Sequence, residues 1–558
     1  MKHTLFSKHS SPLSFVFALG VFVFSFGFLF YRSRIGVDFF DEPYYAALAL
    51  RLHLGQKPFI DELYLAQTFS LLTFPLLKIY WAINQSLEGI ISFYRMANAV
   101  LYLGLGYFIF SAFKTSVGKS MALLIAAACP LFFPGNMTTL GYNSLGSFFL
   151  TVSLITYFIG MNKSTTSLFA LSGIFMGLSC ISYVTFCAMA LFFFFYSLIF
   201  EKKKERALFF ALGVALVLLW PLRFILADWA SFLKSVEFGK EYHHEAPSLL
   251  KLVEVIHKFF PKTVIALFAM FLGLCHWAHK YSSKAFDLLL MSVPLVAALC
   301  CNLSYSFWSG YPFYLSLLSL SAFYRLTQNY YALSLLKWIF FPSFIAGLIT
   351  AGTSASGFIN AQVGLLPATL AGLSFLGLGL SFSSLNNSLS RIAALALPVF
   401  LLLFYPLNVW SDAEFSQLTQ KITLGPYRGL YTAPEKKKIA EESFSILKPL
   451  LTTQGPLLIY PNSPSGYLVN PVPPAKGVVW YENSGRTNEI LAGLYKEQMN
   501  PDSRVIRMKV WYASPTVKST HHFDAKDPLN QLIESTHHVI QETQWFTVFA
   551  PNPAPSRG

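Results

Sequence analysis

The chain has 558 residues, of which 54% are hydrophobic and 17% aromatic, and its mean hydropathy is +0.51. Soluble domains are about 45–50% apolar, so this composition indicates a membrane protein. The formal net charge of +14 is expected on cytoplasmic loops near lipid headgroups, and nothing indicates a nucleic-acid-binding module. The six cysteines are scattered through hydrophobic segments without metal-ligand spacing.

Windows of about 20 apolar residues predict about thirteen membrane-spanning helices. The predicted spans are 12–31, 93–113, 119–135, 140–160, 166–182, 184–200, 207–226, 262–279, 286–303, 312–326, 334–351, 362–382 and 391–409. The run Ser167–Phe200 is divided at Tyr183, because an odd number of spans places the Lys- and Arg-rich loops on one side. This pattern predicts a cytoplasmic N-terminus and an extracytoplasmic C-terminal tail.

Two long extracytoplasmic loops, 32–92 and 227–261, exceed ordinary connection lengths, and such loops are commonly functional. In the first loop, Tyr44–Leu54 and Leu63–Ile83 are predicted to be helices lying at the membrane surface. The second loop carries His243 and His244 among acidic residues. A metal site is one interpretation of this pair, and a solvated loop is the better one, because no third ligand has a convincing spacing.

The composition after Trp410 changes to that of a soluble domain. Strands are predicted at 457–460, 478–481, 505–510 and 545–550, and helices at 435–453, 488–499 and 529–542. The chain is therefore predicted to be a polytopic α-helical membrane domain over residues 1–409, followed by an extracytoplasmic α/β domain with one sheet over residues 410–558.

The pair Asp41-Glu42 is the strongest candidate for chemistry. It follows the first span and opens the first predicted surface helix, where the helix dipole favours ionised carboxylates. Charges beside a bilayer are costly, so such a cluster is a functional-site hypothesis by default. Solvated loop charge is the alternative. A carboxylate kept ionised in this position is able to act as a general base.

The first loop also carries a spaced motif after a single apolar span. It reads Asp41-Glu42-x-x-Tyr45, with Ala46, Gly55, Pro58 and Asp61 further on. Together with Ser92–Asn98 and Gly173-x-x-x-Gly177, this motif resembles the first periplasmic loop of GT-C glycosyltransferases, most of all the protein O-mannosyltransferase and lipid A aminoarabinose transferase group. The resemblance implies the GT-C fold and an inverting transfer of sugar from a polyprenyl-phosphate donor.

The resemblance also implies roles for individual residues. Asp41 would be the general base, with Glu42 as its catalytic neighbour. Residues expected to bind substrate are Asp38, Tyr45, Asp61 and Asn143, together with Arg95, Arg223 and Lys57 as cations for the donor phosphate. For each of these cations, an interfacial position without ligand is an equal alternative. Asn143 stands where the family often has a carboxylate, and Tyr183 where it tends to have Lys.

The expected partners are membrane lipid, a polyprenyl-phosphate-linked sugar and an acceptor hydroxyl on lipid A or lipopolysaccharide, another envelope glycan, or a protein. The expected location is a bacterial inner membrane, with the C-terminal domain in the periplasm. No metal ligands are assigned, although the resemblance allows a divalent cation such as Mg²⁺ or Mn²⁺. Two rival functions remain: a transporter or flippase of lipid-linked glycan, and a catalytically degenerate scaffold.

Overall fold

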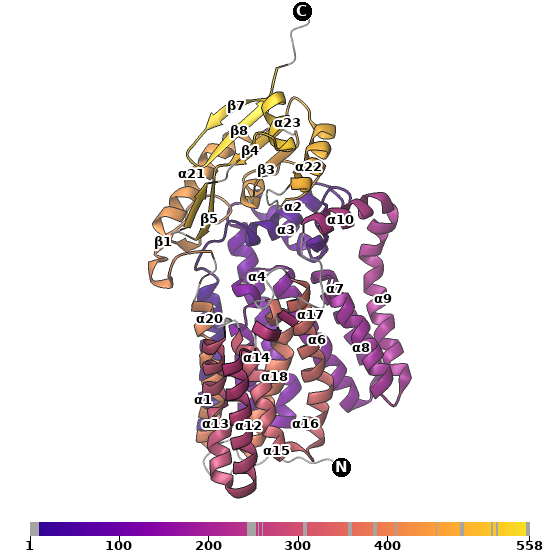
Figure 1. Cartoon of the computed structure of the whole chain (residues 1–558), viewed down its shortest axis with the longest axis vertical. Helices are drawn as coiled ribbons and strands as arrows, with labels where there is room; N and C mark the ends of the chain where they lie inside the picture. The colour runs from indigo at the N-terminus through magenta and orange to yellow at the C-terminus, as the bar shows by residue number, and fades with distance from the viewer. Residues whose placement is uncertain are drawn as a thin grey trace, which may run out of the picture.

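The computed structural model is mostly helical and has a small sheet region at its C-terminal end (Figure 1). It describes residues 11–242, 253–254, 256–258, 260–304, 310–354, 360–382, 388–407, 409, 411–452, 455–461, 463–479, 485–514, 517–520 and 523–553. Across these ranges, 8 helices are long and apolar enough to cross a membrane. The chain is thus built as a polytopic helical membrane protein.

The long apolar helices coincide with predicted spans. They are α1 (Pro12–Arg32), α4 (Ile90–Val117), α6 (Tyr142–Lys163), α9 (Lys204–Ala227), α12 (Lys262–Tyr281), α13 (Ser283–Leu303), α18 (Ala361–Ser381), and the run of α16 (Tyr330–Leu335), a π-helical turn (Leu336–Phe340) and α17 (Phe341–Thr353). Shorter helices occupy the remaining predicted spans: α5 (Lys119–Ala128), α7 (Thr166–Ser182), α8 (Phe186–Phe200), α14 (Tyr311–Ser319) with α15 (Phe323–Leu326), and α19 (Ser388–Leu401), which α20 (Phe404–Leu407) follows. The number of crossings and their orientation stay predictions.

The division of the run Ser167–Phe200 at Tyr183 is confirmed. Helix α7 ends at Ser182, the backbone of Tyr183 is extended (φ −133°, ψ 99°), and α8 begins at Phe186. Both helices pack against α9, and Figure 1 shows these three helices together on one side of the molecule. The break therefore turns the chain back within the membrane domain.

Helix α18 is the central helix of the membrane domain and is buried along almost its whole length. It packs against α17 by backbone contact at two glycines: a Cβ on Gly364 would lie 2.3 Å from the backbone nitrogen of Gly347. Helices α7 and α9 meet in the same way, because a Cβ on Gly173 would lie 2.0 Å from the carbonyl oxygen of Phe210. Small residues at such crossings let membrane helices approach closely. Gly173, which contributed to the family resemblance, thus has a packing role.

The first long loop contains α2 (Asp41–His53), a short 3-10 turn (Leu65–Gln67) and α3 (Ser70–Asn84). Both predicted helices exist, and α2 ends just before Gly55, whose φ is +83°. Every residue from Asp41 to Arg51 is buried, so α2 presents no exposed face, and its position at the membrane surface stays a prediction. The C-terminal domain covers the face that an amphipathic surface helix would present to water.

The C-terminal domain contains a four-stranded sheet of order β3-β4-β8-β7, formed by β3 (Leu457–Tyr460), β4 (Arg504–Met508), β8 (Phe546–Pro551) and β7 (His537–Glu542). Strands β3 and β4 are parallel, and the other pairs are antiparallel. The helices of the domain are α21 (Pro434–Leu450), α22 (Gly485–Gln498) and α23 (Pro528–Thr536). Two small antiparallel ribbons join β1 (Gln420–Lys421) to β2 (Tyr431–Thr432), and β5 (Val510–Ser514) to β6 (Val517–Thr520).

Three details of the C-terminal prediction are wrong. The segment 529–542 is not one helix, because α23 ends at Thr536 and His537–Glu542 forms the edge strand β7, where backbone pairing with β8 overrides the helical pattern. The described part of the strand predicted at 478–481, Val478–Val479, lies in a loop. The two ribbons also add to the single sheet that was expected.

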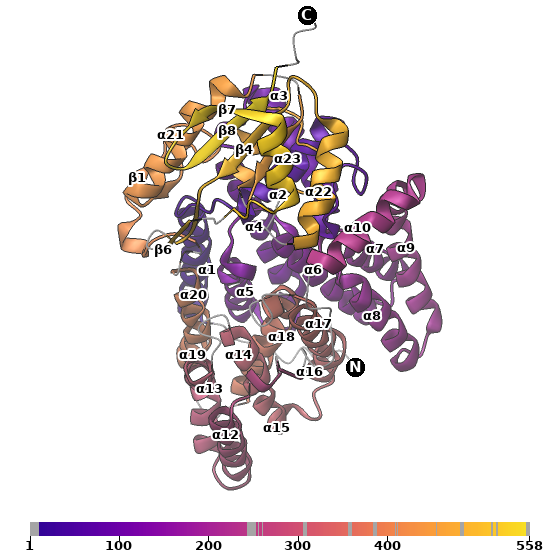
Figure 2. The ribbon, with the colours of Figure 1, turned by 45° about the horizontal axis from the view of Figure 1, so that its top comes forward.

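The first loop and the C-terminal domain share one hydrophobic core. Backbone hydrogen bonds join them at three places: Gly36 N–H to the Tyr431 carbonyl (2.7 Å), Leu63 N–H to the Gly477 carbonyl (2.7 Å), and Gly89 N–H to the Gly425 carbonyl (3.0 Å). Figure 2 shows the domain seated over α2 and α3, with α22 beside α10 (Trp229–Tyr242). The soluble domain therefore forms part of the structure that surrounds α2.

We expect Gly364→Val to lower the stability of the membrane domain by about 1–3 kcal/mol, because the added side chain overlaps the α17 backbone. Thermal unfolding in detergent measures this loss. Gly273→Val in α12 is the matched control, since a Cβ there meets no atom within 4 Å. Equal melting temperatures for the two variants would contradict the proposed α17–α18 contact.

Candidate functional site

Asp38 organises the start of α2. Its carboxylate accepts hydrogen bonds from the backbone N–H groups of Phe40 (3.1 Å), Asp41 (2.7 Å) and Glu42 (3.1 Å). These donors have no partner within the helix, so Asp38 takes the part of a helix cap. Burial and the Glu42 carboxylate raise the pKa of Asp38 to about 6. The structure thus gives this predicted substrate-binding residue a positioning role.

Glu42 and Arg95 form a buried bidentate ion pair between α2 and α4. Arg95 Nε lies 2.8 Å from Glu42 Oε1, and the second guanidinium nitrogen binds Oε2. Arg95 Nη1 also donates to the Ile35 carbonyl (3.0 Å). Glu42 is 2% exposed and Arg95 3%. Arg95 was expected to meet the donor phosphate, and Glu42 was expected beside the reaction. The structure pairs the two side chains with each other, and both roles stay predictions.

Asp41 is the first residue of α2 and, at 9%, the most exposed of the three clustered carboxylates. Its carboxylate lies at the positive end of the helix dipole. Tyr45 lies one turn further along α2, and its ring packs edge-on against that of Tyr142 at 5.3 Å. Burial raises the pKa of Tyr45 well above its ordinary value, and Tyr142, Asp41 and Asp38 add to this. Asp41 therefore lies one helical turn before a buried tyrosine, Tyr45, that stays protonated.

Tyr45 occupies a tightly packed position. Its hydroxyl donates to the Met137 sulfur (3.4 Å), and its ring fills the space where Gly141 would carry a side chain, since a Cβ there would lie 2.4 Å from the ring. Gly141 is the residue just before α6. The aromatic contact therefore joins the start of α2 to the start of α6.

Asn143 lies in the first turn of α6 and is buried. Asn98 of α4 donates from its amide to the Thr138 carbonyl (2.9 Å). Within the described residues, four buried side-chain oxygens in this region have no hydrogen-bond partner: Asn98 Oδ1, Thr138 Oγ1, Thr139 Oγ1 and Asn143 Oδ1. Buried polar atoms without a partner are costly, so this region near the start of α6 has unmet hydrogen-bonding capacity.

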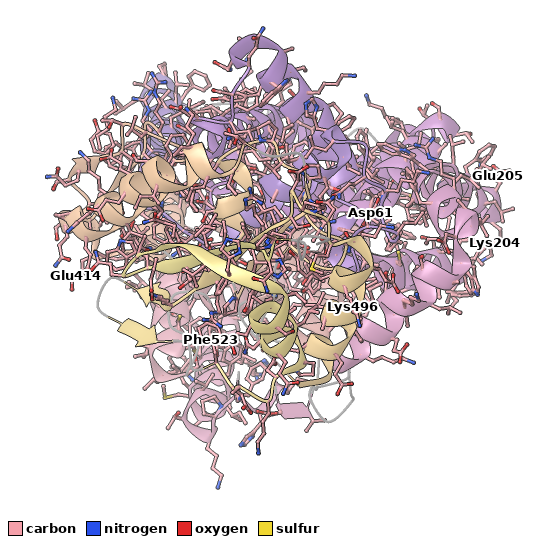
Figure 3. The ribbon with its side chains drawn as sticks, turned by 90° about the horizontal axis from the view of Figure 1, so that it is seen from above. Asp61, Lys204, Glu205, Glu414, Lys496 and Phe523 are labelled. Carbon is pink, nitrogen blue, oxygen red and sulfur yellow. The ribbon has the colours of Figure 1, made fainter. Side chains whose placement is uncertain are left out.

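Lys57 and Asp61 lie beyond the far end of α2. The Lys57 backbone N–H donates to Asp61 Oδ2 (2.7 Å), while the Lys57 side chain is exposed. Asp61 faces Lys476 of the C-terminal domain at 3.8 Å. Seen from above, Asp61 lies toward the middle of the molecule, whereas Lys204 and Glu205 lie at its edge (Figure 3). Asp61 therefore belongs to a domain contact.

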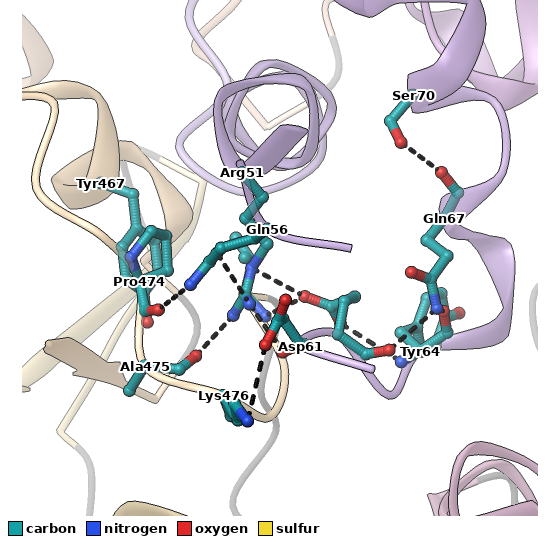
Figure 4. A network of polar contacts seen from close by, with 12 residues as sticks. Arg51, Gln56, Asp61, Tyr64, Gln67, Ser70, Tyr467, Pro474, Ala475 and Lys476 are labelled. Atoms are coloured by element: carbon teal, nitrogen blue, oxygen red, sulfur yellow. Dashed lines mark hydrogen bonds and ion pairs between the residues drawn. The ribbon is translucent and has the colours of Figure 1, made fainter. Parts of the chain in front are cut away.

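That contact is built on a buried ion pair between Arg51 and Glu62 (3.2 Å), which the sequence reasoning missed. Figure 4 shows Arg51 between Asp61 and Ala475 of the C-terminal domain. Arg51 also donates to the carbonyls of Asp61 (2.7 Å) and Ala475 (2.7 Å). Burial raises the pKa of Glu62 to about 7, although Arg51 lowers it. An arginine within the apolar run of α2 was the available signal, because a buried cation needs a partner.

The sequence placed two further candidates in and after α9. Arg223 is exposed on α9, and its guanidinium lies 4.6 Å from the centre of the Phe224 ring. His243 and His244 lie outside the described residues. In the described part of the chain, no group of three His, Cys, Asp or Glu side chains is placed to hold a metal ion. We therefore assign no ligands to a cation.

No family model matches this sequence, and a search of curated proteins finds no significant match. The resemblance to GT-C glycosyltransferases therefore stays a prediction that depends on the first-loop motif and the site geometry.

We expect Glu62→Gln to flatten the pH dependence of stability between about pH 4.5 and about pH 7. The pKa of Glu62 is raised from 4.5 to about 7 in the folded chain, so the folded state binds more protons there in this window. Its stabilising effect is complete below the unfolded pKa and is lost as the pH rises to about 7. Melting temperatures at several pH values measure the change.

The control for this experiment is Glu534→Gln, because Glu534 is an exposed partner of Arg507. Its melting curve should follow the wild-type pH dependence. An identical pH dependence in Glu62→Gln and wild type would show that Glu62 titrates at an ordinary pKa.

Proposed function

We propose that the protein is a membrane glycosyltransferase of the GT-C type, which moves a sugar from a polyprenyl-phosphate donor to an acceptor hydroxyl outside the cytoplasm. The observation that carries this proposal is the buried acidic start of α2. Asp38 caps the helix, Glu42 pairs with Arg95, and Asp41 is held at the N-terminal turn between them. Asp41 is the most exposed of these three carboxylates, which supports it as the reacting one.

In this proposal, Asp41 accepts the proton of the acceptor hydroxyl while the hydroxyl oxygen attacks the anomeric carbon of the donor. The bond from that carbon to the phosphate oxygen breaks, and polyprenyl phosphate leaves with the electron pair. The configuration at the anomeric carbon is therefore inverted. Positioned general bases contribute about 10²–10⁴-fold to such reactions. The unpartnered oxygens of Asn98, Thr138 and Asn143 support a sugar-binding role for the neighbouring polar region.

The proposal places the protein in a bacterial inner membrane, with about thirteen crossings, a cytoplasmic N-terminus and a periplasmic C-terminal domain. The acceptor class is lipid A or lipopolysaccharide, another envelope glycan, or a protein. Because Arg95 is paired with Glu42, donor-phosphate binding by Arg95 requires that pair to rearrange. A divalent cation such as Mg²⁺ or Mn²⁺ remains compatible with the family resemblance.

A catalytically degenerate scaffold is the second candidate function. It is favoured by Asn143, an amide where the family often has a carboxylate, and by the closed Glu42–Arg95 pair. A flippase is the third candidate, and no observation favours it.

We expect Asp41→Asn to reduce sugar transfer by at least about 100-fold, because an amide cannot accept the hydroxyl proton. The assay follows radiolabelled sugar from a panel of polyprenyl-phosphate pentoses and hexoses into envelope lipid, glycan and protein fractions of membranes. Membranes are matched for the amount of folded protein.

The matched control is Asp228→Asn, because Asp228 is a partly buried carboxylate at the start of another helix, α10, where it accepts a hydrogen bond from the Ser231 N–H (2.9 Å). Transfer at the wild-type rate by Asp41→Asn would contradict the general-base role. No transfer with any donor, together with unaltered envelope glycans in a null strain, would favour the scaffold.

A further inference from the structure

The C-terminal domain contributes a buried lysine to the start of α2. Lys436 lies in the first turn of α21 and is 0% exposed. Its ammonium donates to the Val37 carbonyl (2.6 Å) and to the Ser411 carbonyl, and it lies 5.2 Å from the centre of the Phe39 ring. Burying an ammonium is costly unless charge and hydrogen bonds compensate it. The position of Lys436 therefore requires an acidic environment.

That environment is the acidic site itself. The charged groups that act on Lys436 are Asp412, which precedes β1, Asp38 and Glu42 at the start of α2, and the like charge of Arg95 on α4. Burial lowers the pKa of Lys436, and the three carboxylates raise it. Two cations from different domains thus face three carboxylates in one buried region.

The backbone N–H and carbonyl of Val37 are both bound by residues of the C-terminal domain. Its N–H donates to Asp412 Oδ2 (2.6 Å), and its carbonyl accepts from Lys436 (2.6 Å). The same Asp412 oxygen also accepts from the Thr432 hydroxyl (2.6 Å). Val37 directly precedes Asp38, which caps α2 through the N–H groups of Asp41 and Glu42. The path from Lys436 to the Asp41 backbone is therefore short and continuous.

We propose that Lys436 is a positioning residue for Asp41, which holds the backbone before α2 and balances the carboxylates around it, so that the reacting site includes the C-terminal domain. This inference rests on the proposed function. A C-terminal domain that only recognised the acceptor would not need a buried cation beside the site.

The test compares Lys436→Met with Lys438→Met. Lys438 lies two residues further along α21, and its side chain is 60% exposed, so the control removes the same charge from the surface of the same helix. We expect Lys436→Met to move the acidic limb of the pH profile for sugar transfer upward, because Lys436 lowers the pKa of Asp38, and its loss leaves the carboxylates around Asp41 with one cation fewer. Lys438→Met should leave the limb unchanged.

Two further variants distinguish the effect of the Lys436 charge from a failure of the variant to fold. Lys436→Arg keeps the charge and should restore the wild-type limb. Asp412→Asn removes a carboxylate from the same region and should move the limb downward, which provides a test if Lys436→Met does not fold. An unchanged acidic limb in both Lys436→Met and Asp412→Asn, with transfer still abolished by Asp41→Asn, would overturn the inference and leave the proposed function standing.

A measurement that does not depend on sugar transfer tests the positioning role of Lys436 when Asp41 is not the base. If Asp41→Asn retains transfer, the general-base role of Asp41 fails, and backbone hydrogen exchange at residues 37–42 decides whether Lys436 positions the start of α2. Faster exchange in Lys436→Met than in Lys438→Met supports the inference that Lys436 fixes the Val37 backbone. Equal exchange in the two variants overturns that inference.

Discussion

The structure depends on keeping the charged first turn of α2 buried without leaving a charge unbalanced. A buried carboxylate that loses its partner costs several kcal/mol, so the ion pair between Glu42 and Arg95 constrains everything around it. It fixes α2 against α4 and, through the Arg95 contact with the Ile35 carbonyl, fixes the chain that leaves α1. The capping carboxylate of Asp38 then sets where the helix begins.

The two ends of α2 are held in the same way. Arg51 lies ten residues after Asp41, about 15 Å along the helix, and pairs with Glu62 while it donates to the Ala475 carbonyl. Lys436 performs the corresponding task at the start of the helix. At each end, the C-terminal domain supplies a contact to a buried ion-pair network. The domain and the first loop therefore form one structural unit above the membrane helices.

This arrangement bears on how a membrane enzyme of the proposed type would hold its base. Helix α2 is buried along its length, so its first turn is not free to follow the motions of a surface loop. Tyr45 and Gly141 join this turn to the start of α6, where the polar region around Asn143 lies. The base and the proposed sugar-binding region are thus positioned by direct packing.

Much of this molecule followed from local patterns in the sequence. Apolar runs predicted the membrane helices, the distribution of Lys and Arg between the loops predicted the division at Tyr183, and Asp41-Glu42 marked the start of α2. The helix predicted over 529–542 failed because β7 owes its conformation to pairing with β8, a contact between segments that no local window contains.

The sequence by itself determined the membrane class, the main helices and the acidic cluster, because hydrophobic period and helix-end preferences act within a few residues. Only the tertiary structure decided which charges pair. Arg95 was expected to bind a phosphate and forms an ion pair with Glu42. Neither the Arg51–Glu62 ion pair nor the contact of Lys436 with the first loop was predicted. The physical reason is that the cost of a buried charge depends on what surrounds it in space, and these partners lie up to hundreds of residues apart in the chain.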